Sequence, residues 1–346
     1  MSVEAVLQRI WYGPVWLGLP LLPLSAVFWL LVSLRRGLYR LGILRRHRVP
    51  VPVVVVGNLT VGGTGKTPIT GWLGRQLQLR GHRVGIVLRG YGARHSGAPR
   101  VVTAVDDAAE VGDEALLHAR RGPQVVVIGA DRVAAARLAV EQGAEIVVCD
   151  DGLQHLRLAR DYEIAVVDAA RGFGNRLLLP AGPLREPASR IETVDAVILT
   201  RRCESAEAAP RPRGPFVAEA RYDLGAAVNV RSGERRELAT FRGTRVDAFA
   251  GIGNPQAFFA ALGAAGIIAE THALADHGTL DPRHLPFPDG TTVMMTEKDA
   301  VKCASHARPD WWYVELDVVI ERDMARDLVA LVLERTGLTG AGVKLG

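Results

Sequence analysis

Runs of apolar residues without polar alternation recur along the chain from residue 51 onward. The first, VPVVVVGN at residues 51–58, predicts a strand that is buried on both faces of a parallel sheet. A segment of helical composition, Asp131–Gln142, separates two of the later runs. Strands that alternate with helices in this way predict an α/β domain with a mostly parallel sheet. The later runs are Val84–Leu88, Val125–Ile128, Ile146–Cys149, Ile164–Val167 and Ala196–Leu199.

A change in pattern after residue 201 predicts a second part of the chain. Ala, Pro, Arg and Glu dominate Arg202–Pro215, as is typical of a linker. Residues 216–238 alternate and turn at Ser232-Gly233, which predicts a β-hairpin. A second α/β pattern begins at Val246. Its predicted elements are a strand at 247–253, a helix at Pro255–Ala265, strands at Ile267–His272, Thr292–Thr296 and Trp312–Leu316, and a helix at Met324–Glu334.

The start of the chain has a different composition. No charged residue occurs in Ile10–Leu34, a stretch of 25 residues rich in leucine and tryptophan. About 20 apolar residues are enough to span a bilayer, so the length alone fits a transmembrane helix. Prolines interrupt the stretch, and each one ends a helix or removes one of its hydrogen bonds. They are Pro14, Pro20 and Pro23, and the segment left before the charges, Leu24–Leu34, is too short to cross.

From Pro23 onward the pattern is amphipathic. Apolar residues recur at helical spacing at Val27, Leu31, Leu34, Leu38 and Leu41. Arginines lie off this apolar face, at Arg35, Arg36 and Arg40. Three more come after the amphipathic pattern, at Arg45, Arg46 and Arg48. We therefore predict that residues 1–45 form an interfacial helix with its basic side toward anionic head groups. A true membrane span and a buried core helix are the alternatives. A secretory signal peptide fits badly, because the start is not clearly basic and no small-residue cleavage site ends the apolar run.

Composition narrows the class of protein. The 346 residues allow two domains, and 48% hydrophobic with 23% charged residues excludes wholesale disorder, a collagen-like repeat and a protein with many membrane spans. The three cysteines, Cys149, Cys203 and Cys303, have no C-x-x-C spacing, which argues against a disulfide framework or a cysteine-rich zinc site. The net charge of +5 is modest, and no basic stripe with aromatics occurs, so we expect no nucleic-acid partner.

A glycine-rich loop follows the first predicted strand. Its residues match the P-loop pattern G-x-x-x-x-G-K-[ST] at every position but the first, and they are Thr60, Val61, Gly62, Gly63, Thr64, Gly65, Lys66 and Thr67. In such a loop the backbone N–H groups face phosphates, Lys66 adds a cation and Thr67 can bind Mg²⁺. Lys66 is one of only four lysines among 42 basic residues. A helix predicted at Ile69–Leu79 completes the context for nucleotide binding; a glycine-rich turn without a ligand is the alternative.

Two carboxylates end a later strand. Asp150 and Asp151 follow the apolar run Ile146–Cys149. In a P-loop fold a carboxylate at this place lies beside the phosphate loop and can hold Mg²⁺ directly or through water. The alternative is an ordinary strand end with a capping aspartate. We therefore predict both residues as metal-side carboxylates.

Seven motifs in a fixed order make the prediction more specific. They are GNLTVGGTGKTP at 57–68, LRGYG at 88–92, VGDEALL at 111–117, DDGLQH at 150–155, LLPAGPLREP at 178–187, ADHGTLD at 275–281 and TEKDAVK at 296–302. This series resembles the tetraacyldisaccharide 4′-kinase family of lipid A biosynthesis over nearly the whole chain. The resemblance implies transfer of the ATP γ-phosphate to the 4′-hydroxyl of a tetraacyldisaccharide 1-phosphate, giving lipid IVA, at the cytoplasmic face of the inner membrane of Gram-negative bacteria.

The resemblance also implies the fold and the division of the chain. The family has two α/β/α sandwich domains joined by a β-stranded linker, and it uses ATP and Mg²⁺. We accordingly expect a membrane-interface helix, a P-loop kinase domain, a β-hairpin linker and a C-terminal α/β domain, at residues 1–45, 46–215, 216–240 and 241–346. The expected partners are the lipid substrate and inner-membrane lipids, with the chain attached peripherally or monotopically.

Residue roles follow from the matching motifs. Asp113 resembles the family's catalytic aspartate and His277 its dyad partner, so we expect Asp113 to act as the base while His277 orients it. A helix N-cap and an ordinary loop histidine are the alternatives that local sequence favours. Further residues are expected near the substrate, phosphates or Mg²⁺: Gln154, His155, Arg185 and Asp276, and Glu186 is expected to help bind Mg²⁺. Lys298 and Lys302 are expected to shape the face of the second domain, or to start a solvated helix.

Two other functions have less support from the sequence. A membrane-associated nucleotide switch would carry a lysine at Val61 if it were a partitioning ATPase. A GTPase would need [NT]-K-x-D, but Lys298 comes one place late, and it would need D-x-x-G, but Cys149 stands three residues before Gly152. A kinase for a soluble small molecule leaves the apolar start of the chain unexplained.

Overall fold

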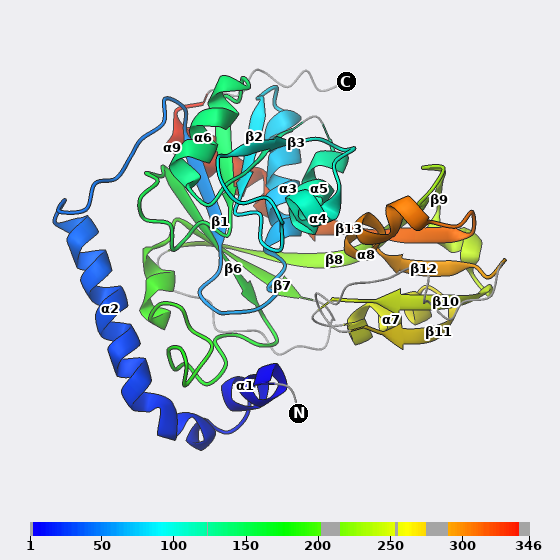
Figure 1. Cartoon of the computed structure of the whole chain (residues 1–346), viewed down its shortest axis with the longest axis horizontal. Coiled ribbons are helices and arrows are strands. Elements are labelled where there is room, and N and C mark those ends of the chain that lie inside the picture. The colour runs from blue at the N-terminus through cyan, green and yellow to red at the C-terminus, as the bar shows by residue number, and fades with distance from the viewer. Residues whose placement is uncertain (1–2, 123, 202–214, 253–254, 275–289, 339–346) are drawn as a thin grey trace.

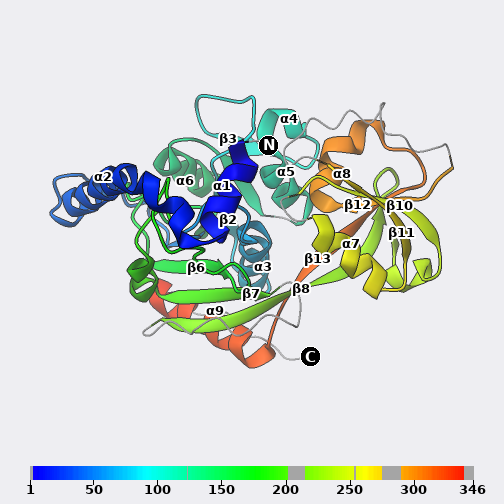
Figure 2. The ribbon, with the colours of Figure 1, turned by 90° about the horizontal axis from the view of Figure 1, so that it is seen from below.

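The computed structural model describes residues 3–122, 124–201, 215–252, 255–274 and 290–338. It is a mixed α/β protein with a larger body and a smaller body on one continuous sheet (Figures 1 and 2). The strands run in the order β11-β10-β12-β13-β8-β7-β6-β1-β5-β2-β4-β3, with β9 paired to β8. Pairing is parallel except between β3 and β4, β13 and β8, and β8 and β9. The predicted mostly parallel α/β fold is therefore confirmed.

The strand bounds agree with the apolar runs in the sequence. In the larger body the strands are β1 (Val53–Gly57), β2 (Val84–Leu88), β3 (Arg100–Val102), β4 (Val125–Ile128), β5 (Ile146–Asp150), β6 (Tyr162–Asp168) and β7 (Ala196–Arg201). Strands β8 (Phe216–Asn229) and β13 (Trp311–Ile320) reach both bodies, and β9 (Arg235–Arg236), β10 (Arg245–Ala250), β11 (Ile268–Ala273) and β12 (Val293–Thr296) complete the sheet. The edge strand β3 is antiparallel and was not predicted.

Helices cover both faces of the sheet. In the larger body they are α3 (Lys66–Gln78), α4 (Ala108–Val111), α5 (Asp113–Arg120), α6 (Arg132–Glu141), η2 (Ala188–Thr193) and α9 (Arg322–Thr336). In the smaller body they are η3 (Leu238–Phe241), α7 (Pro255–Ala264), α8 (Glu297–Cys303) and η5 (Ala304–His306). Side chains of α3, α5 and α9 share one core with one face of the sheet, and those of α6 share a second core with the other.

The two bodies are connected by strands. The predicted hairpin at 216–238 forms, but β9 pairs with β8 over only two residues, at Ala227 with Arg236 and Val228 with Arg235. The long partner of β8 is β13, which returns antiparallel to it. A second contact joins the bodies through their helices, because Arg121 Nε donates to Glu297 Oε1 at 2.7 Å. The domain boundaries given above stay a prediction.

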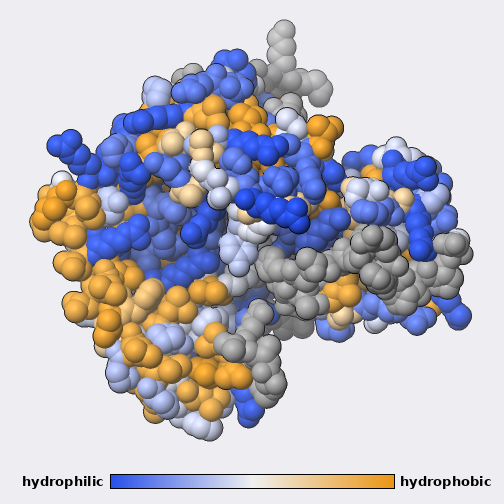
Figure 3. Space-filling view, in the orientation of Figure 1, coloured by the Kyte–Doolittle hydropathy of each residue, from blue (hydrophilic) through white to orange (hydrophobic). Residues whose placement is uncertain are grey.

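The start of the chain forms three helices, α1 (Val3–Tyr12), η1 (Val15–Leu21) and α2 (Leu22–Arg40). Pro23 lies in the first turn of α2, where a proline costs no hydrogen bond, so α2 is longer than the segment predicted from the prolines. Among the described residues, the helical stretch Val15–Arg40 is long and apolar enough to cross a membrane by length and composition. Figure 3 shows its apolar residues along one side of the molecule.

Hydrogen bonds from α1 and from the start of α2 attach these helices to the body. Trp11 Nε1 donates to the carbonyl of Pro180 at 2.9 Å, and Ser25 Oγ donates to that of Leu178 at 2.9 Å. Between Ser25 and the end of α2 most apolar side chains face outward; Leu30 and Leu31 are each about 60% exposed. A buried core helix is therefore excluded for α2.

Candidate active site

The phosphate loop lies between β1 and α3, as predicted. Gly62 and Gly65 have φ values of 106° and 82°, which only glycine adopts readily, and Gly65 is the N-cap of α3. The Val61 N–H donates to the carbonyl of Pro183 at 2.8 Å, and the Tyr222 hydroxyl donates to the carbonyl of Gly65 at 2.9 Å. The loop is thus held on one side by the segment before Arg185 and on the other by β8.

Two residues hold the side chain of Lys66. Its ammonium group donates to Asn58 Oδ1 at 3.1 Å and lies 3.3 Å from Asp151 Oδ1. Asn58 also contacts the carbonyl of Gly62 at 3.4 Å, so this amide connects the end of β1 to the loop. These contacts place the lysine side chain between the phosphate loop and the end of β5.

Asp151 is the centre of an ion-pair cluster. Arg185 Nη1 lies 3.1 Å from each of its carboxylate oxygens. Burial alone would raise the pKa of Asp151, but Lys66 and Arg185 outweigh it and the pKa is lowered. Asp151 therefore stays ionised. Its φ of 52° is unusual for a residue other than glycine and marks a tight turn at the strand end.

Asp150 is different, because its carboxylate is buried and accepts no hydrogen bond from the described residues. It is 3% exposed, and neither oxygen has a hydrogen-bond partner among the described residues. The nearest cationic candidate is His118, whose Nε2 lies 3.5 Å from Asp150 Oδ2 and is equally buried. A buried carboxylate costs stability unless it is paired or binds a cation. Asp150 therefore fits a divalent-metal ligand beside the phosphate loop.

Glu186 lies at the end of the same network, but its contacts differ from those of a metal ligand. Gln154 Nε2 donates to Glu186 Oε1 at 3.0 Å and to the carbonyl of Asn58 at 3.1 Å. Arg36 of α2 lies 3.0 Å from Glu186 Oε2, and Arg190 lies 3.6 Å from it. These guanidinium groups already neutralise Glu186, so its Mg²⁺ role stays a prediction without support from these contacts.

His155 lies at the other end of the predicted DDGLQH motif. Burial is the main reason that its pKa is lowered to about 4, and the charges of Arg132 and Arg89 act in the same direction. The imidazole is therefore neutral near pH 7. A neutral ring can donate one hydrogen bond to a phosphate or a sugar, but it adds no positive charge to the site.

Asp113 contacts the smaller body through two lysines. It begins α5, and its Oδ2 lies 3.6 Å from Lys298 Nζ and 3.7 Å from Lys302 Nζ, both on α8. Three of the four lysines in the sequence, Lys66, Lys298 and Lys302, thus lie in the candidate active site. Lys298 and Lys302 do not start a purely solvated helix, since both side chains are largely buried against the aspartate.

Glu114 is a site residue that sequence reasoning did not single out. Its side chain is in contact with solvent, yet surrounding protein limits its hydration and the charges of Asp150 and Asp113 lie nearby. Together these raise the pKa of Glu114 to about 7, although Lys298 and Lys66 act in the opposite direction. A carboxylate close to Asp150 adds negative charge where a divalent cation would be stabilised.

The structure brings together most of the predicted residues and adds some that were missed. Asn58, Glu114, His118 and Tyr222 have contacts in the site but no assigned role in the sequence. Asn58 and Glu114 lie inside quoted motifs and could have been found there, whereas Tyr222 reaches the loop from a distant strand. Asp276 and His277 lie outside the described residues.

Comparison with known proteins identifies the family of the chain. The family model described as tetraacyldisaccharide-1-P 4′-kinase matches residues 17–333. A tetraacyldisaccharide 4′-kinase of Pseudomonas paraeruginosa is 47% identical over 322 residues, covering 92% of this chain and 94% of that protein. One of Pasteurella multocida is 43% identical over 327 residues, covering 93% and 97%.

A solved structure agrees with the fold. The crystal structure of LpxK from Aquifex aeolicus in complex with ATP has a TM-score of 0.81 and 29% sequence identity, covering 92% of this chain and 99% of that one. The family model and the relatives each cover most of the chain at high similarity. The chain therefore belongs to the tetraacyldisaccharide-1-phosphate 4′-kinase family.

Proposed function

We propose that the chain is an ATP-dependent kinase that transfers the γ-phosphate to the 4′-hydroxyl of a tetraacyldisaccharide 1-phosphate, forming lipid IVA. The observation that carries this proposal is the arrangement of Lys66 between Asn58 and Asp151, next to the unpaired carboxylate of Asp150. Phosphoryl transfer depends chiefly on positioning and charge stabilisation, and these residues supply both. The family membership and the ATP-bound relative support the same reaction.

The loop residues 60–67 hold the phosphates of ATP in this proposal. Gly62 and Gly63 are exposed, and a side-chain carbon added at either would meet no atom within 4 Å, so the loop faces open space. Thr67 and Asp150 would hold Mg²⁺, with Asp151 and Glu114 in the surrounding carboxylate shell. When bound, Mg²⁺ neutralises negative charge on the phosphate oxygens. Lys66 is drawn away from Asp151 toward the phosphates, which leaves Arg185 as the partner of Asp151.

Asp113 acts on the acceptor. A positioned base contributes about 10²–10⁴-fold to a proton transfer, and the sugar hydroxyl must lose a proton as it attacks. Lys298 and Lys302 hold the Asp113 carboxylate at the start of α5. In this proposal His277 orients Asp113, and Gln154, His155 and Asp276 act on the substrate or the phosphates. Because Asp113 contacts Lys298 and Lys302 of the smaller body, closure of the two bodies over ATP would exclude water and limit hydrolysis.

We propose that the start of the chain attaches the enzyme to the cytoplasmic face of the inner membrane. The acceptor carries several acyl chains, and pulling them into water would cost about 0.8 kcal/mol per CH₂ group. An enzyme that lies on the leaflet needs to reach only the head group. The exposed apolar face of α2 and its terminal arginines support peripheral attachment without a crossing.

Transfer of labelled phosphate tests the proposal. The protein is incubated with γ-labelled ATP, Mg²⁺ and a panel of lipid disaccharides and soluble sugars. We expect labelled product only with the tetraacyldisaccharide 1-phosphate. Label released as free phosphate with every acceptor would indicate a nucleotide switch, and label on a soluble sugar would indicate a small-molecule kinase; either result would contradict the proposal.

A further inference from the structure

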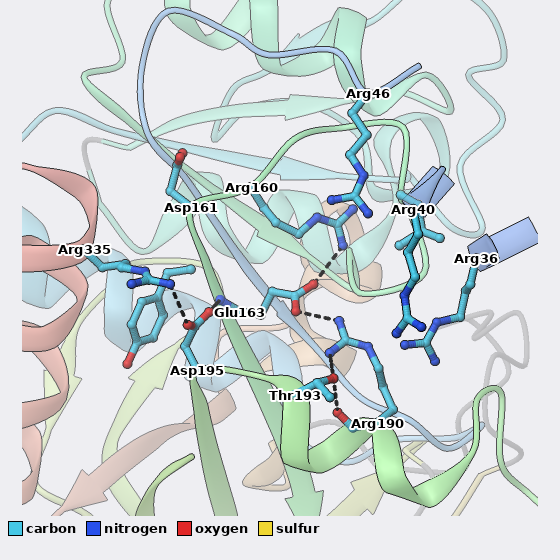
Figure 4. A pocket seen from close by; sticks show the side chains of 12 residues that line it. Arg36, Arg40, Arg46, Arg160, Asp161, Glu163, Arg190, Thr193, Asp195 and Arg335 are labelled. Atoms are coloured by element: carbon cyan, nitrogen blue, oxygen red, sulfur yellow. Dashed lines mark hydrogen bonds and ion pairs between the residues drawn. The ribbon is translucent and has the colours of Figure 1, made fainter. Parts of the chain in front are cut away.

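A second polar pocket lies away from the phosphate loop, between the end of α2 and the strand β6 (Figure 4). It encloses about 360 Å³. Six arginines line it: Arg36, Arg40, Arg46, Arg160, Arg190 and Arg335. Only three lining residues are acidic, so the pocket carries an excess of positive charge. We call it the arginine pocket.

Part of this charge is neutralised within the protein. Glu163 lies between two of the arginines, 3.2 Å from Arg160 Nη1 and 2.5 Å from Arg190 Nη2 (Figure 4). Arg335 lies 4.0 Å from Asp195 at the other side of the pocket. The Glu163 carboxylate therefore pairs with two buried guanidinium groups, those of Arg160 and Arg190. Burial, together with the charge of Arg190, lowers the pKa of Arg160, although Glu163 opposes this.

Two arginines have no such partner. Arg40 and Arg46 have no ion pair or hydrogen bond of their side chains within the described part of the chain. Figure 4 shows both side chains directed toward the region where Arg36, Arg160 and Arg190 also end. Guanidinium groups that converge repel one another unless an anion lies between them. A phosphate group matches this arrangement, because its oxygens accept paired N–H donors from several arginines.

The pocket lies close to the surface that is proposed to meet the membrane. Arg40 ends α2, and Leu34 is six residues earlier, about 9 Å along the helix axis. Leu34 is 56% exposed, and Leu41 and Ile43, directly after α2, are 77% and 65% exposed. Exposed apolar side chains therefore flank the pocket arginines on both sides along the chain. A helix that rests on the leaflet with these residues would place the pocket at the level of lipid phosphates.

We propose that the arginine pocket binds the phosphate of an anionic membrane phospholipid, at a site separate from the phosphate loop. The proposal rests on the membrane attachment proposed above. A phosphate held by Arg40 and Arg46 from α2 and its following loop, and by Arg160 and Arg190 from the body, fixes the end of α2 against the body. Because Arg36 also contacts Glu186 of the catalytic network, this contact sets the height of the phosphate loop above the leaflet.

Co-sedimentation with vesicles at physiological salt tests the site in the full-length protein. The vesicles contain phosphatidylcholine alone or phosphatidylcholine with phosphatidylglycerol. The double variant R40Q/R46Q removes the two unpaired arginines. The control R9Q/R45Q removes the same charge from two exposed positions that do not line the pocket. We expect R40Q/R46Q to bind anionic vesicles about 30-fold more weakly, while R9Q/R45Q loses no more than about fivefold, because all four arginines are exposed but only Arg40 and Arg46 line the pocket and can share one bound phosphate. Equal losses in the two double variants would overturn the proposal.

Two further measurements separate the sources of phosphate. If inorganic phosphate raises the Tm of the unmodified protein but not of R40Q/R46Q, while vesicles bind both equally, the pocket takes free phosphate and the lipid assignment is wrong. If R40Q/R46Q, but not R9Q/R45Q, raises KM for the tetraacyldisaccharide 1-phosphate in neutral detergent micelles, the pocket belongs to the substrate, which also contradicts the proposal. Unchanged kinase activity in those micelles, with the vesicle defect present, supports it. Absence of activity in the unmodified protein would instead contradict the proposed function.

Discussion

The ammonium group of Lys66 lies 3.3 Å from Asp151 Oδ1, an ion pair between the phosphate loop and the end of β5. Arg185 also contacts this carboxylate, with Nη1 at 3.1 Å from both oxygens. Asp151 therefore has two cationic partners, and both lower its pKa. We expect Lys66 to move from Asp151 to the phosphates when ATP binds, which would leave Arg185 paired with Asp151.

Replacing Lys66 by alanine removes the side-chain cation of the loop. We expect Lys66→Ala to lower kcat by at least about 10²-fold, because the transferred phosphate loses a preorganised positive charge. The protein should stay folded, since Arg185 still pairs with Asp151. Arg75→Ala, an exposed position on the same helix, is the matched control and should keep its activity. Steady-state kinetics and thermal unfolding measure both effects; near-normal kcat in Lys66→Ala would contradict the assignment of the loop.

Removing the proposed base should slow phosphate transfer to the acceptor without weakening the binding of ATP. We expect Asp113→Ala to lower kcat by about 10²–10⁴-fold and to leave the Kd for ATP nearly unchanged. His277→Ala should behave in the same way, and the double variant should lose much less than the product of the two single effects, because the residues act as a unit. Loss of ATP binding with kcat retained at saturation would show that Asp113 is instead a nucleotide or metal ligand.

The raised pKa of Glu114 predicts a pH-dependent stability. Between the ordinary value of 4.5 and the folded value of about 7, the folded protein binds more protons than the unfolded one, so this group lowers stability as the pH rises through that window. We expect Glu114→Gln to raise the Tm of the nucleotide-free protein at pH 8 and to have a smaller effect as the pH falls from 7 toward 4.5. A Tm difference that is constant with pH would count against this.

Exposed leucines on α2 test how the chain is attached. Leu30→Gln and Leu31→Gln replace side chains that are about 60% exposed, so thermal stability in detergent should not fall. Membrane association and activity toward the lipid should both fall, because apolar surface at the interface is lost. Truncation to begin near Arg48 should remove both. Retention of both in the truncated protein would refute the interfacial role.

The orientation of the start of the chain distinguishes attachment from crossing. Ser2→Cys introduces a thiol near the N-terminus, and a membrane-impermeant thiol reagent is applied to intact cells. We expect no labelling, since a peripheral helix keeps both of its ends on the cytoplasmic side. Labelling from the periplasm would mean that α2 crosses the membrane.

The strands of the larger body could be predicted from the sequence because they are buried on both faces. Val53–Gly57, for example, has no exposed position, so its apolar run identifies it without ambiguity. The edge strand Arg100–Val102 was missed because it is short and its first two residues are only partly buried. The start of α2 was also misjudged, since a proline interrupts a helix in its interior but is tolerated in its first turn.

The site was only partly predictable for a different reason. The phosphate loop and Asp150 follow directly from strand ends, which sequence patterns locate well. Contacts between distant segments do not follow from such patterns. Tyr222 reaches Gly65 from β8, and Lys298 and Lys302 reach Asp113 from α8, which depends on how the two bodies meet. Glu186, expected to bind Mg²⁺, is likewise found paired with arginines, and one of them, Arg36, comes from the distant helix α2.

The position of the transferred phosphate tests the central claim most directly. The purified protein is incubated with ATP, Mg²⁺ and tetraacyldisaccharide 1-phosphate in neutral detergent micelles, and phosphorus NMR with mass spectrometry locates the new phosphate. We predict one new phosphomonoester on the 4′-oxygen, formed by the unmodified protein and missing with Lys66→Ala. Hydrolysis of ATP without any phosphorylated lipid, or a phosphate at another hydroxyl, would contradict the account.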